Sequence, residues 1–186
     1  MTTNVQTRDD LPQFFIDMGY KVGAEIGVWK GEFSEKFLQA GLTMYAVDPW
    51  MPFKGQGRHQ RFPEIQDSYY QVAVKRLSQY PDCVIIRKTS MDAVEDFRDR
   101  SLDFVYIDGN HSFRYFAEDL HEWSQKVRPG GCIAGHDYFD TAPWATNIIC
   151  HVKTVVDAYV ELFQIKGLCI IGDSDHRTKS WLWIKE

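Results

Sequence analysis

Short apolar runs alternate with amphipathic segments along most of the chain. Five of these runs predict β-strands, at residues 22–26, 43–47, 83–87, 104–107 and 131–134. Strands that alternate with helical segments in this way are typical of a parallel sheet in an α/β fold. We therefore expect one sheet whose first five strands all run in the same direction.

Amphipathic helices are predicted between these strands. The clearest pattern places apolar residues three, one, three, three and four positions apart, at Phe113, Phe116, Ala117, Leu120, Trp123 and Val127. Weaker helical patterns occupy residues 33–38 and 69–77. A longer pattern covers residues 145–162, and we expect that helix to cover the sheet.

The C-terminal part of the chain follows a different pattern. Two β-rich runs, at residues 163–171 and 180–184, are joined by the polar residues 172–179. With no helix between them, these two strands should pair antiparallel. The expected fold is therefore a mostly parallel seven-stranded sheet with an antiparallel C-terminal strand.

The composition is that of a single globular domain. With 186 residues, 44% of them hydrophobic and 25% charged, the chain has room for one domain over residues 1–186 with a substantial core. A net charge of -5 argues against nucleic acid as a partner, because phosphate backbones bind basic surfaces. Neither a signal pattern nor an apolar stretch of membrane-spanning length is found, so we expect a cytoplasmic protein with no membrane partner.

The four cysteines are far apart in the sequence and form no Cys-x-x-Cys pair. Three of them lie in strongly apolar runs. We interpret all four as buried thiols of a reducing compartment.

Residues 49–63 form a candidate lid. This stretch contains three prolines and two glycines, together with the basic residues Lys54, Arg58, His59 and Arg61. Loops of this length inside a compact domain are usually functional or disordered, and a solvated insertion is the alternative. As a lid, its basic residues would favour an anionic or polyhydroxylated substrate.

A glycine-rich turn follows the first predicted strand. Gly27 and Gly31 would let the backbone approach a ligand at the start of a helix, and Asp48, 21 residues after Gly27, could bind a ribose diol. A dinucleotide fingerprint would need glycines at positions 25 and 30, where this chain has Glu25 and Lys30. A carboxylate at position 25 repels a pyrophosphate but attracts the ammonium and sulfonium of S-adenosylmethionine. The turn therefore favours a cationic nucleoside, and glycines that serve packing alone are the alternative.

With Glu25, Gly27 and Gly31 the chain resembles the class I S-adenosylmethionine-dependent methyltransferases, whose first motif is an acid followed by Gly-x-x-x-Gly. The resemblance extends from Gly23 onward and implies a Rossmann-like sandwich. It also implies contacts near the adenine from further residues, namely Trp50, Ser90 and Met91. Trp50 could equally be a packing residue.

Acids and imidazoles follow the fourth and fifth predicted strands. Asp108 and His111 come after the fourth strand, and His136 and Asp137 come after the fifth. Ligands of open α/β sheets bind outside the carboxyl ends of the strands, so these side chains should converge beside Glu25 and Asp48. Such a donor set suits Mg²⁺, Mn²⁺ or Zn²⁺.

Here the resemblance narrows to the small metal-dependent O-methyltransferases of the catechol and antibiotic-sugar types. In that group an Asp after strand four and an acidic pair after strand five hold the metal. The resemblance assigns Asp108 to the metal and to the cofactor site, and it assigns His136 and Asp137 to the pair. The imidazole of His136 departs from the group, which has a carboxylate there, and this leaves the identity and the use of the metal open.

The resemblance also points to a general base. Catechol enzymes place a Lys base three residues after the first metal ligand, which is the position of His111 here. The sugar enzymes place an Asp two residues after that ligand, where this chain has Asn110, which cannot usefully accept a proton. We assign the base to His111, and we expect the positive end of the following helix and the metal to lower its pKa.

The favoured function is methyl transfer from S-adenosylmethionine to a hydroxyl of a small molecule or sugar, assisted by a divalent metal. The alternatives are an N-methyltransferase, another metal-dependent enzyme on this fold, and a catalytically idle cofactor-binding subunit. The Asn/Asp-Pro-Pro-aromatic motif common in N-methyltransferases does not follow the fourth strand. Each site residue also has a structural explanation, because Asp108 could cap a helix and residues 136–137 could form a turn. A homodimer is a further expectation.

Overall fold

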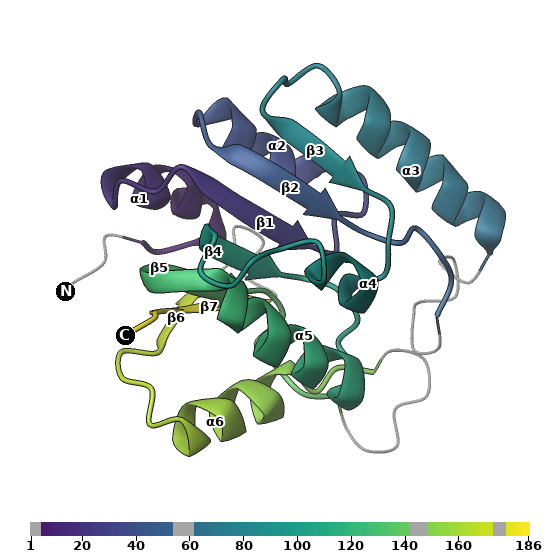
Figure 1. Cartoon of the computed structure of the whole chain (residues 1–186). Helices are drawn as coiled ribbons and strands as arrows, with labels where there is room; N and C mark the ends of the chain where they lie inside the picture. The colour runs from purple at the N-terminus through teal and green to yellow at the C-terminus, as the bar shows by residue number, and fades with distance from the viewer. Residues whose placement is uncertain (1–4, 54–61, 142–148, 173–177) are drawn as a thin grey trace.

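The computed structural model describes residues 5–53, 62–141, 149–172 and 178–186. Within these ranges seven strands form one sheet in the order β3-β2-β1-β4-β5-β7-β6 (Figure 1). The strands are β1 (Val22–Ile26), β2 (Thr43–Val47), β3 (Cys83–Ile86), β4 (Leu102–Ile107), β5 (Val127–Gly135), β6 (Cys169–Gly172) and β7 (Lys179–Ile184). Strand β7 runs antiparallel to both β5 and β6, and all the other neighbouring strands pair parallel. The predicted sheet is confirmed.

Helices cover both faces of the sheet (Figure 1). One face carries α1 (Leu11–Asp17), α2 (Glu32–Gln39) and α3 (Pro63–Leu77), and the other carries α4 (Ser90–Val94), α5 (Phe113–Lys126) and α6 (Val152–Leu162). Each face has its own buried apolar cluster. Phe15 packs on Phe104 with ring centroids 4.3 Å apart on the first face, and Phe116 packs on Trp181 at 6.0 Å on the second.

Three predicted boundaries are wrong near the C-terminus. Val127 belongs to β5 instead of the preceding helix, because its backbone is already extended. The helix predicted over residues 145–162 begins only at Val152, since residues 149–151 are not helical and residues 145–148 lie outside the described ranges. The strand predicted over residues 163–171 is reduced to β6, because positive φ angles at Gln164 and Gly167 mark the turn that ends α6.

An N-terminal unit was not predicted from the sequence. A 3₁₀ turn, η1 (Arg8–Asp10), leads into α1, whose Leu11 and Phe15 are fully buried. The carboxylate of Asp10 accepts the backbone amide of Thr7 at 2.9 Å, and the amide of Gly172 donates to the carbonyl of Gln6 at 2.8 Å. These bonds fix the N-terminal segment beside β6. Arg8 of this segment lies near Asp108, which follows β4.

The four cysteines agree with expectation only in part, and the candidate lid stays a prediction. Cys132 and Cys150 are buried, whereas Cys83 and Cys169 are half-buried, and all four are free thiols. Of the candidate lid at 49–63, residues 54–61 lie outside the described ranges, and Pro63 is the first residue of α3.

Among the described helices, none combines the length and apolar character needed to cross a membrane.

Candidate active site

The candidate site lies where the strand order reverses, between β1 and β4. Backbone hydrogen bonds continue there past the strand ends. The amide of Asp108 donates to Ile26 at 2.7 Å, the amide of Gly27 donates to Val47 at 2.9 Å, and the amide of His136 donates to Ile107 at 3.1 Å. The ends of four neighbouring strands are thus held side by side at one edge, and the sequence-predicted acids and imidazoles lie on that edge.

The glycines of the turn are required by the chain's own packing. Gly27 has a φ of 91°, and a Cβ built there would lie 2.2 Å from the carbonyl oxygen of Asp108. Gly31 has a φ of 77° at the N-cap of α2, and a Cβ there would lie 3.0 Å from the side chain of Leu77. Packing and dihedral angles alone therefore account for both glycines. Their close approach to a ligand stays a prediction.

Asp48 organises the glycine-rich turn. Its Oδ2 accepts the amides of Val28 at 2.9 Å and Trp29 at 3.0 Å, and its Oδ1 accepts the amide of Trp50 at 2.7 Å. Trp29 and Trp50 have positive φ angles of 53° and 45°, a strained conformation that this network holds in place. Three of the roughly four acceptor sites of the carboxylate are therefore used, and the one that is left, on Oδ1, could accept a ribose hydroxyl, which stays a prediction.

Trp50 and Trp29 differ in exposure. Trp50 is 2% exposed, packs on the ring of Tyr70 at 5.0 Å and donates its indole N–H to the carbonyl of Trp29 at 2.7 Å. These are packing contacts, and stacking of Trp50 on an adenine stays a prediction. Trp29 is 44% exposed and has the Lys30 ammonium 4.4 Å from its ring centroid. Its exposed indole on a strained backbone was not identified from the sequence.

Ser90 and Met91 lie at the start of α4 and face α5. The hydroxyl of Ser90 accepts the indole N–H of Trp123 at 2.7 Å and also bonds to the carboxyl group of Asp119. Met91 packs against the apolar cluster on this face. Burial raises the pKa of Asp119 to about 7. The predicted adenine contacts of Ser90 and Met91 stay predictions, and Asp119 is a buried acid that the sequence patterns did not single out.

Glu25 is a buried acid on β1, with only 2% of its surface exposed. Burial raises its pKa to about 8, although the hydroxyl of Ser34, which donates a hydrogen bond to Glu25, and the positive charge of Arg8 act in the opposite direction. Without a ligand the carboxyl group is therefore largely protonated at neutral pH. A cation bound beside it would favour the ionised form.

The buried acid predicts a specific pH dependence of stability. In the unfolded chain Glu25 ionises near its ordinary pKa of 4.5, whereas in the folded protein it stays protonated up to about 8. Between these values the unfolded state binds fewer protons than the folded state, so the free energy of unfolding falls as the pH rises. Glu25→Gln should lose less stability than the wild type between pH 5 and pH 8 in urea denaturation. Glu64→Gln, at an exposed position of α3, is the control. Parallel plots of the free energy of unfolding against pH for wild type and Glu25→Gln would contradict this effect.

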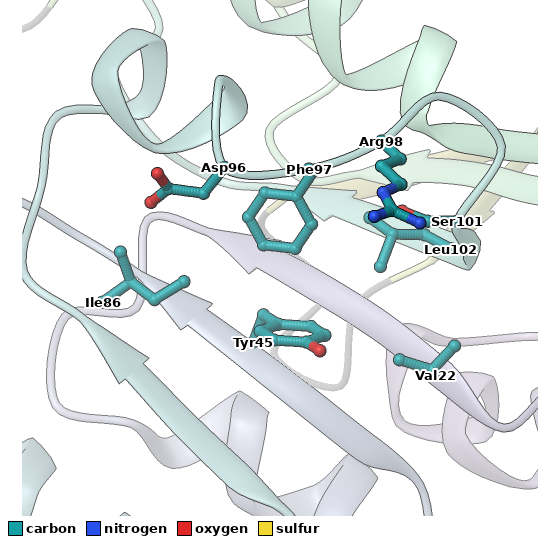
Figure 2. Close-up of a pocket in the computed structure, with 8 residues that line it drawn as sticks. All are labelled: Val22, Tyr45, Ile86, Asp96, Phe97, Arg98, Ser101 and Leu102. Carbon is teal, nitrogen blue, oxygen red and sulfur yellow. The ribbon is translucent and has the colours of Figure 1, made fainter.

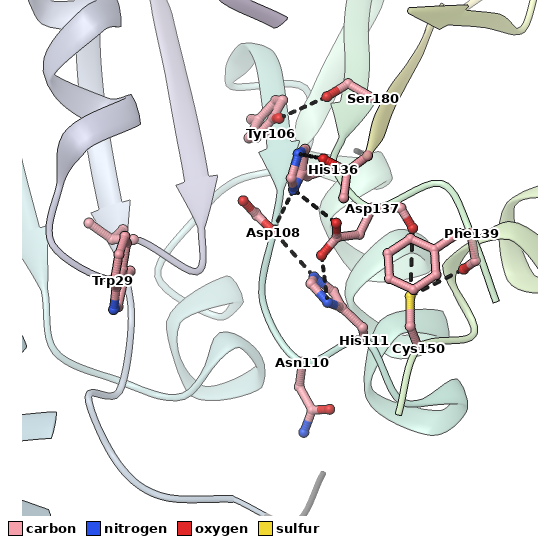
Figure 3. Close-up of polar contacts among 12 residues, drawn as sticks. Trp29, Tyr106, Asp108, Asn110, His111, His136, Asp137, Phe139, Cys150 and Ser180 are labelled. Carbon is pink, nitrogen blue, oxygen red and sulfur yellow. Dashed lines mark hydrogen bonds and ion pairs between the residues drawn. The ribbon is translucent and has the colours of Figure 1, made fainter. Parts of the chain in front are cut away.

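Two acids and two imidazoles meet at the ends of β4 and β5 (Figure 3). His111 lies between the acids, with Nε2 3.3 Å from Oδ1 of Asp108 and Nδ1 3.2 Å from Oδ2 of Asp137. Nδ1 of His136 lies 3.6 Å from Oδ1 of Asp108 and 3.3 Å from Oδ1 of Asp137. Each imidazole therefore touches both carboxylates, and the structure brings together the four residues that the sequence placed at this edge.

These contacts change the protonation of the cluster. Burial alone would raise the pKa of Asp108, but the two imidazoles hold it below its ordinary value. Burial alone would lower the pKa of both histidines, but Asp108 and Asp137 act in the opposite direction and more strongly. The pKa of His111 is raised, and the pKa of His136 is raised to about 9. The expected lowering of the His111 pKa by a helix end is therefore wrong. His111 precedes the N-cap of α5, Ser112, and two adjacent carboxylates outweigh the helix dipole.

Comparison with known proteins shows the family of this chain. Residues 24–138, more than half of the chain, match a family model described as a methyltransferase domain. The chain belongs to this methyltransferase family. It is also 26% identical over 93 residues to the uncharacterised protein y4gI of Sinorhizobium fredii. That alignment covers 50% of this chain and 10% of the relative, so the chain spans about a tenth of that protein's length.

Solved structures share the fold of this methyltransferase domain. An O-methyltransferase from Bacillus cereus in complex with SAH has a TM-score of 0.67 at 13% identity, over 96% of this chain and 80% of that one. The O-methyltransferase TomG of Streptomyces achromogenes, in complex with SAM, has a TM-score of 0.63 at 11% identity. The match covers 96% of this chain and 79% of TomG. A Burkholderia thailandensis N1-methyltransferase with bound S-adenosylhomocysteine has a TM-score of 0.63 at 11% identity. The match covers 97% of this chain and 79% of that protein. At such identities the likeness shows the fold.

The residues of the methyltransferase fit a divalent metal. Asp108, His111 and Asp137 each offer one ligand atom, and these atoms lie within 4.8 Å of one another. Nε2 of His111 is buried and lies 3.3 Å from Oδ1 of Asp108. Nε2 of His136 lies 3.1 Å from the hydroxyl of Thr178, which leaves Nδ1 facing the carboxylates. Carboxylate oxygens and imidazole nitrogens are the donors that such ions take in proteins.

A separate cavity of about 290 Å³ lies away from this edge (Figure 2). It includes the first residues of β1 and β4, which are at the opposite end of the sheet from Asp108. Its lining is mixed, with the rings of Tyr45 and Phe97 in edge contact at 4.9 Å. The residues around it are Val22, Tyr45, Ile86, Asp96, Phe97, Arg98, Ser101 and Leu102.

Proposed function

We propose that this domain transfers a methyl group from S-adenosylmethionine to a hydroxyl group of a small molecule or sugar, with the help of a divalent metal. The observation that carries the proposal is the cluster of two carboxylates and two imidazoles beside the glycine-rich turn. Two of the solved O-methyltransferases with this fold hold SAH or SAM, which supports the choice of cofactor.

S-adenosylmethionine supplies the methyl group as an electrophile on a sulfonium. In the proposed complex Glu25 binds the ammonium of its amino-acid end, and the backbone at Gly27 and Gly31 lines the turn. Asp48 accepts a ribose hydroxyl with the one lone pair, on Oδ1, that its three backbone donors leave. The adenine side of the site is assigned to Trp50, Ser90 and Met91, and Asp108 adjoins the cofactor from β4.

The metal would be held by Asp108, Asp137 and His136. The ligand atoms of Asp108, His111 and Asp137 lie within 4.8 Å of one another, so His111 is the alternative imidazole ligand. A bound divalent ion would lower the pKa of the acceptor hydroxyl and fix its orientation. His136 has the pattern of a ligating histidine, because one ring nitrogen faces the acids and the other has a hydrogen-bond partner in Thr178. An imidazole in the set suits Mn²⁺ or Zn²⁺, and two carboxylates suit Mg²⁺.

His111 is the proposed base. The two acids on either side orient its ring and stabilise the imidazolium that forms when it accepts the hydroxyl proton. Both ring nitrogens face a carboxylate in the structure, at 3.3 and 3.2 Å, so one of these contacts must open before that nitrogen can take the hydroxyl proton. Asn110 is excluded from this role, because its side-chain oxygen accepts bonds from the amide and hydroxyl of Ser112 and an amide is a poor base.

An acceptor screen tests the proposal. Phenols, sugars and nucleotide-sugars are incubated with S-adenosylmethionine and Mg²⁺, Mn²⁺ or Zn²⁺, and S-adenosylhomocysteine is measured. We expect metal-stimulated product with at least one hydroxyl acceptor. Methylation of amines alone, without metal stimulation, would favour the N-methyltransferase alternative, for which the Burkholderia thailandensis relative shows that the fold is suitable.

A further inference from the structure

Arg8 reaches the active-site edge from the N-terminal turn η1. Its Nη1 lies 3.9 Å from Oδ2 of Asp108, which is the oxygen that the two histidines leave unused. The guanidinium also lies over the ring of Phe33 at 5.0 Å and bonds to the hydroxyl group of Tyr106. It lies outside residues 24–138, so it belongs to no part of the family match.

The turn that carries Arg8 is fixed to the rest of the fold. Asp10 closes η1 by accepting the amides of Gln6 at 3.0 Å and Thr7 at 2.9 Å. Asp9 forms an ion pair with Lys36 of α2 at 2.5 Å. These contacts join η1 to the helix that begins at the glycine-rich turn. The guanidinium is therefore positioned before any ligand arrives, and ordering it costs little entropy on binding.

Arg8 is the positive neighbour of Glu25. Its charge opposes the burial that raises the pKa of Glu25, and it acts on Asp137 in the same direction. An acid at the end of β1 and a guanidinium above the end of β4 thus stand at the same edge. An amino acid carries an ammonium and a carboxylate on one carbon, and this pair of side chains has the complementary charges. Guanidinium groups bind carboxylates with two parallel hydrogen bonds, which Lys cannot make.

We propose that Arg8 binds the carboxylate of the amino-acid end of S-adenosylmethionine, while Glu25 binds its ammonium. This inference rests on the proposed function and adds a cofactor-binding residue from a segment that the sequence patterns left unassigned.

The test compares two ligands that differ only in the carboxylate. S-adenosylhomocysteine and its decarboxylated analogue are titrated by calorimetry into wild type, Arg8→Gln, Arg8→Lys and the control Arg114→Gln. Arg114 pairs with Glu118 on the exposed surface of α5. We expect Arg8→Gln to weaken binding of S-adenosylhomocysteine by at least about tenfold to 150-fold, the range for one lost hydrogen bond to a charged group, and to leave binding of the analogue unchanged. Arg8→Lys should lie between wild type and Arg8→Gln, and Arg114→Gln should match the wild type.

The outcomes separate this inference from the proposed function. If wild type binds neither ligand, the proposed function fails. If wild type binds S-adenosylhomocysteine, but it binds the analogue equally well or Arg8→Gln weakens both ligands alike, Arg8 does not bind the carboxylate. Melting curves without ligand check the folding of each variant. Should Arg8→Gln not fold, the preference for S-adenosylhomocysteine over the decarboxylated analogue is compared between wild type and Arg8→Lys. A smaller preference in Arg8→Lys supports the inference, and an unchanged preference overturns it.

Discussion

Removal of the metal is expected to abolish turnover while most of the cofactor binding remains. The metal would supply several kcal/mol of stabilisation to the developing alkoxide, which corresponds to about 10³-fold in rate. Asp137→Ala should have an effect of the same size, because it removes a carboxylate that contacts both imidazoles. The cofactor contacts assigned to Glu25 and Asp48 do not involve Asp137, so the affinity for S-adenosylhomocysteine should change little.

The measurement is the initial rate with an identified acceptor before and after chelation, followed by addition of Mg²⁺, Mn²⁺ or Zn²⁺. Asp99→Ala is a matched control, since Asp99 is exposed, precedes β4 at the opposite end of the sheet and pairs with Lys126. If the wild-type rate survives chelation and Asp137→Ala keeps its activity, no metal is used. His136 would then have an acid–base or structural role.

His111→Ala should lower turnover by about 10²-fold or more, within the usual range for a general base. The variant removes the imidazole that bridges Asp108 and Asp137 at 3.3 and 3.2 Å. The proposed cofactor contacts are made by other residues, so the affinity for S-adenosylhomocysteine should stay close to that of the wild type. Rates are measured from pH 6 to 9, with His121→Ala on the exposed side of α5 as the control.

A melting curve for His111→Ala shows whether the loss of rate reflects folding. Near-normal turnover of the variant across this pH range would mean that the acceptor hydroxyl ionises without His111. In that case His111 is a substrate contact or a metal ligand, a role that its position within 4.8 Å of the two acids also allows.

Much of the fold could be predicted because its strands are short apolar runs separated by clear helical patterns. The sheet direction followed from the alternation of strands and helices, and β7 followed from the lack of a helix before it. The errors lie where local patterns are ambiguous. An apolar stretch before Val152 has helical spacing, but the backbones of Cys150 and His151 bond to Thr141 and His111 instead of continuing a helix.

Only the site residues that closely follow a strand could be predicted from the sequence. Asp108, His111, His136 and Asp137 converge because the carboxyl ends of neighbouring parallel strands share an edge. Arg8 could not be found in this way, because its place depends on how η1 packs against α2 and β6. The pKa of His111 was misjudged because the prediction weighed only the helix end and the metal. Asp108, three residues earlier in the sequence, raises this pKa most, and Asp137, which follows β5, raises it further.

The central claim is that this domain uses S-adenosylmethionine, and direct calorimetry tests it. Wild type, Glu25→Lys and Asp48→Ala are titrated with S-adenosylmethionine, S-adenosylhomocysteine and NADH. We expect the wild type to bind both sulfur nucleosides and not NADH, and each variant to bind about tenfold to 150-fold more weakly. Binding of NADH by the wild type, with no binding of S-adenosylmethionine or S-adenosylhomocysteine, would contradict the claim.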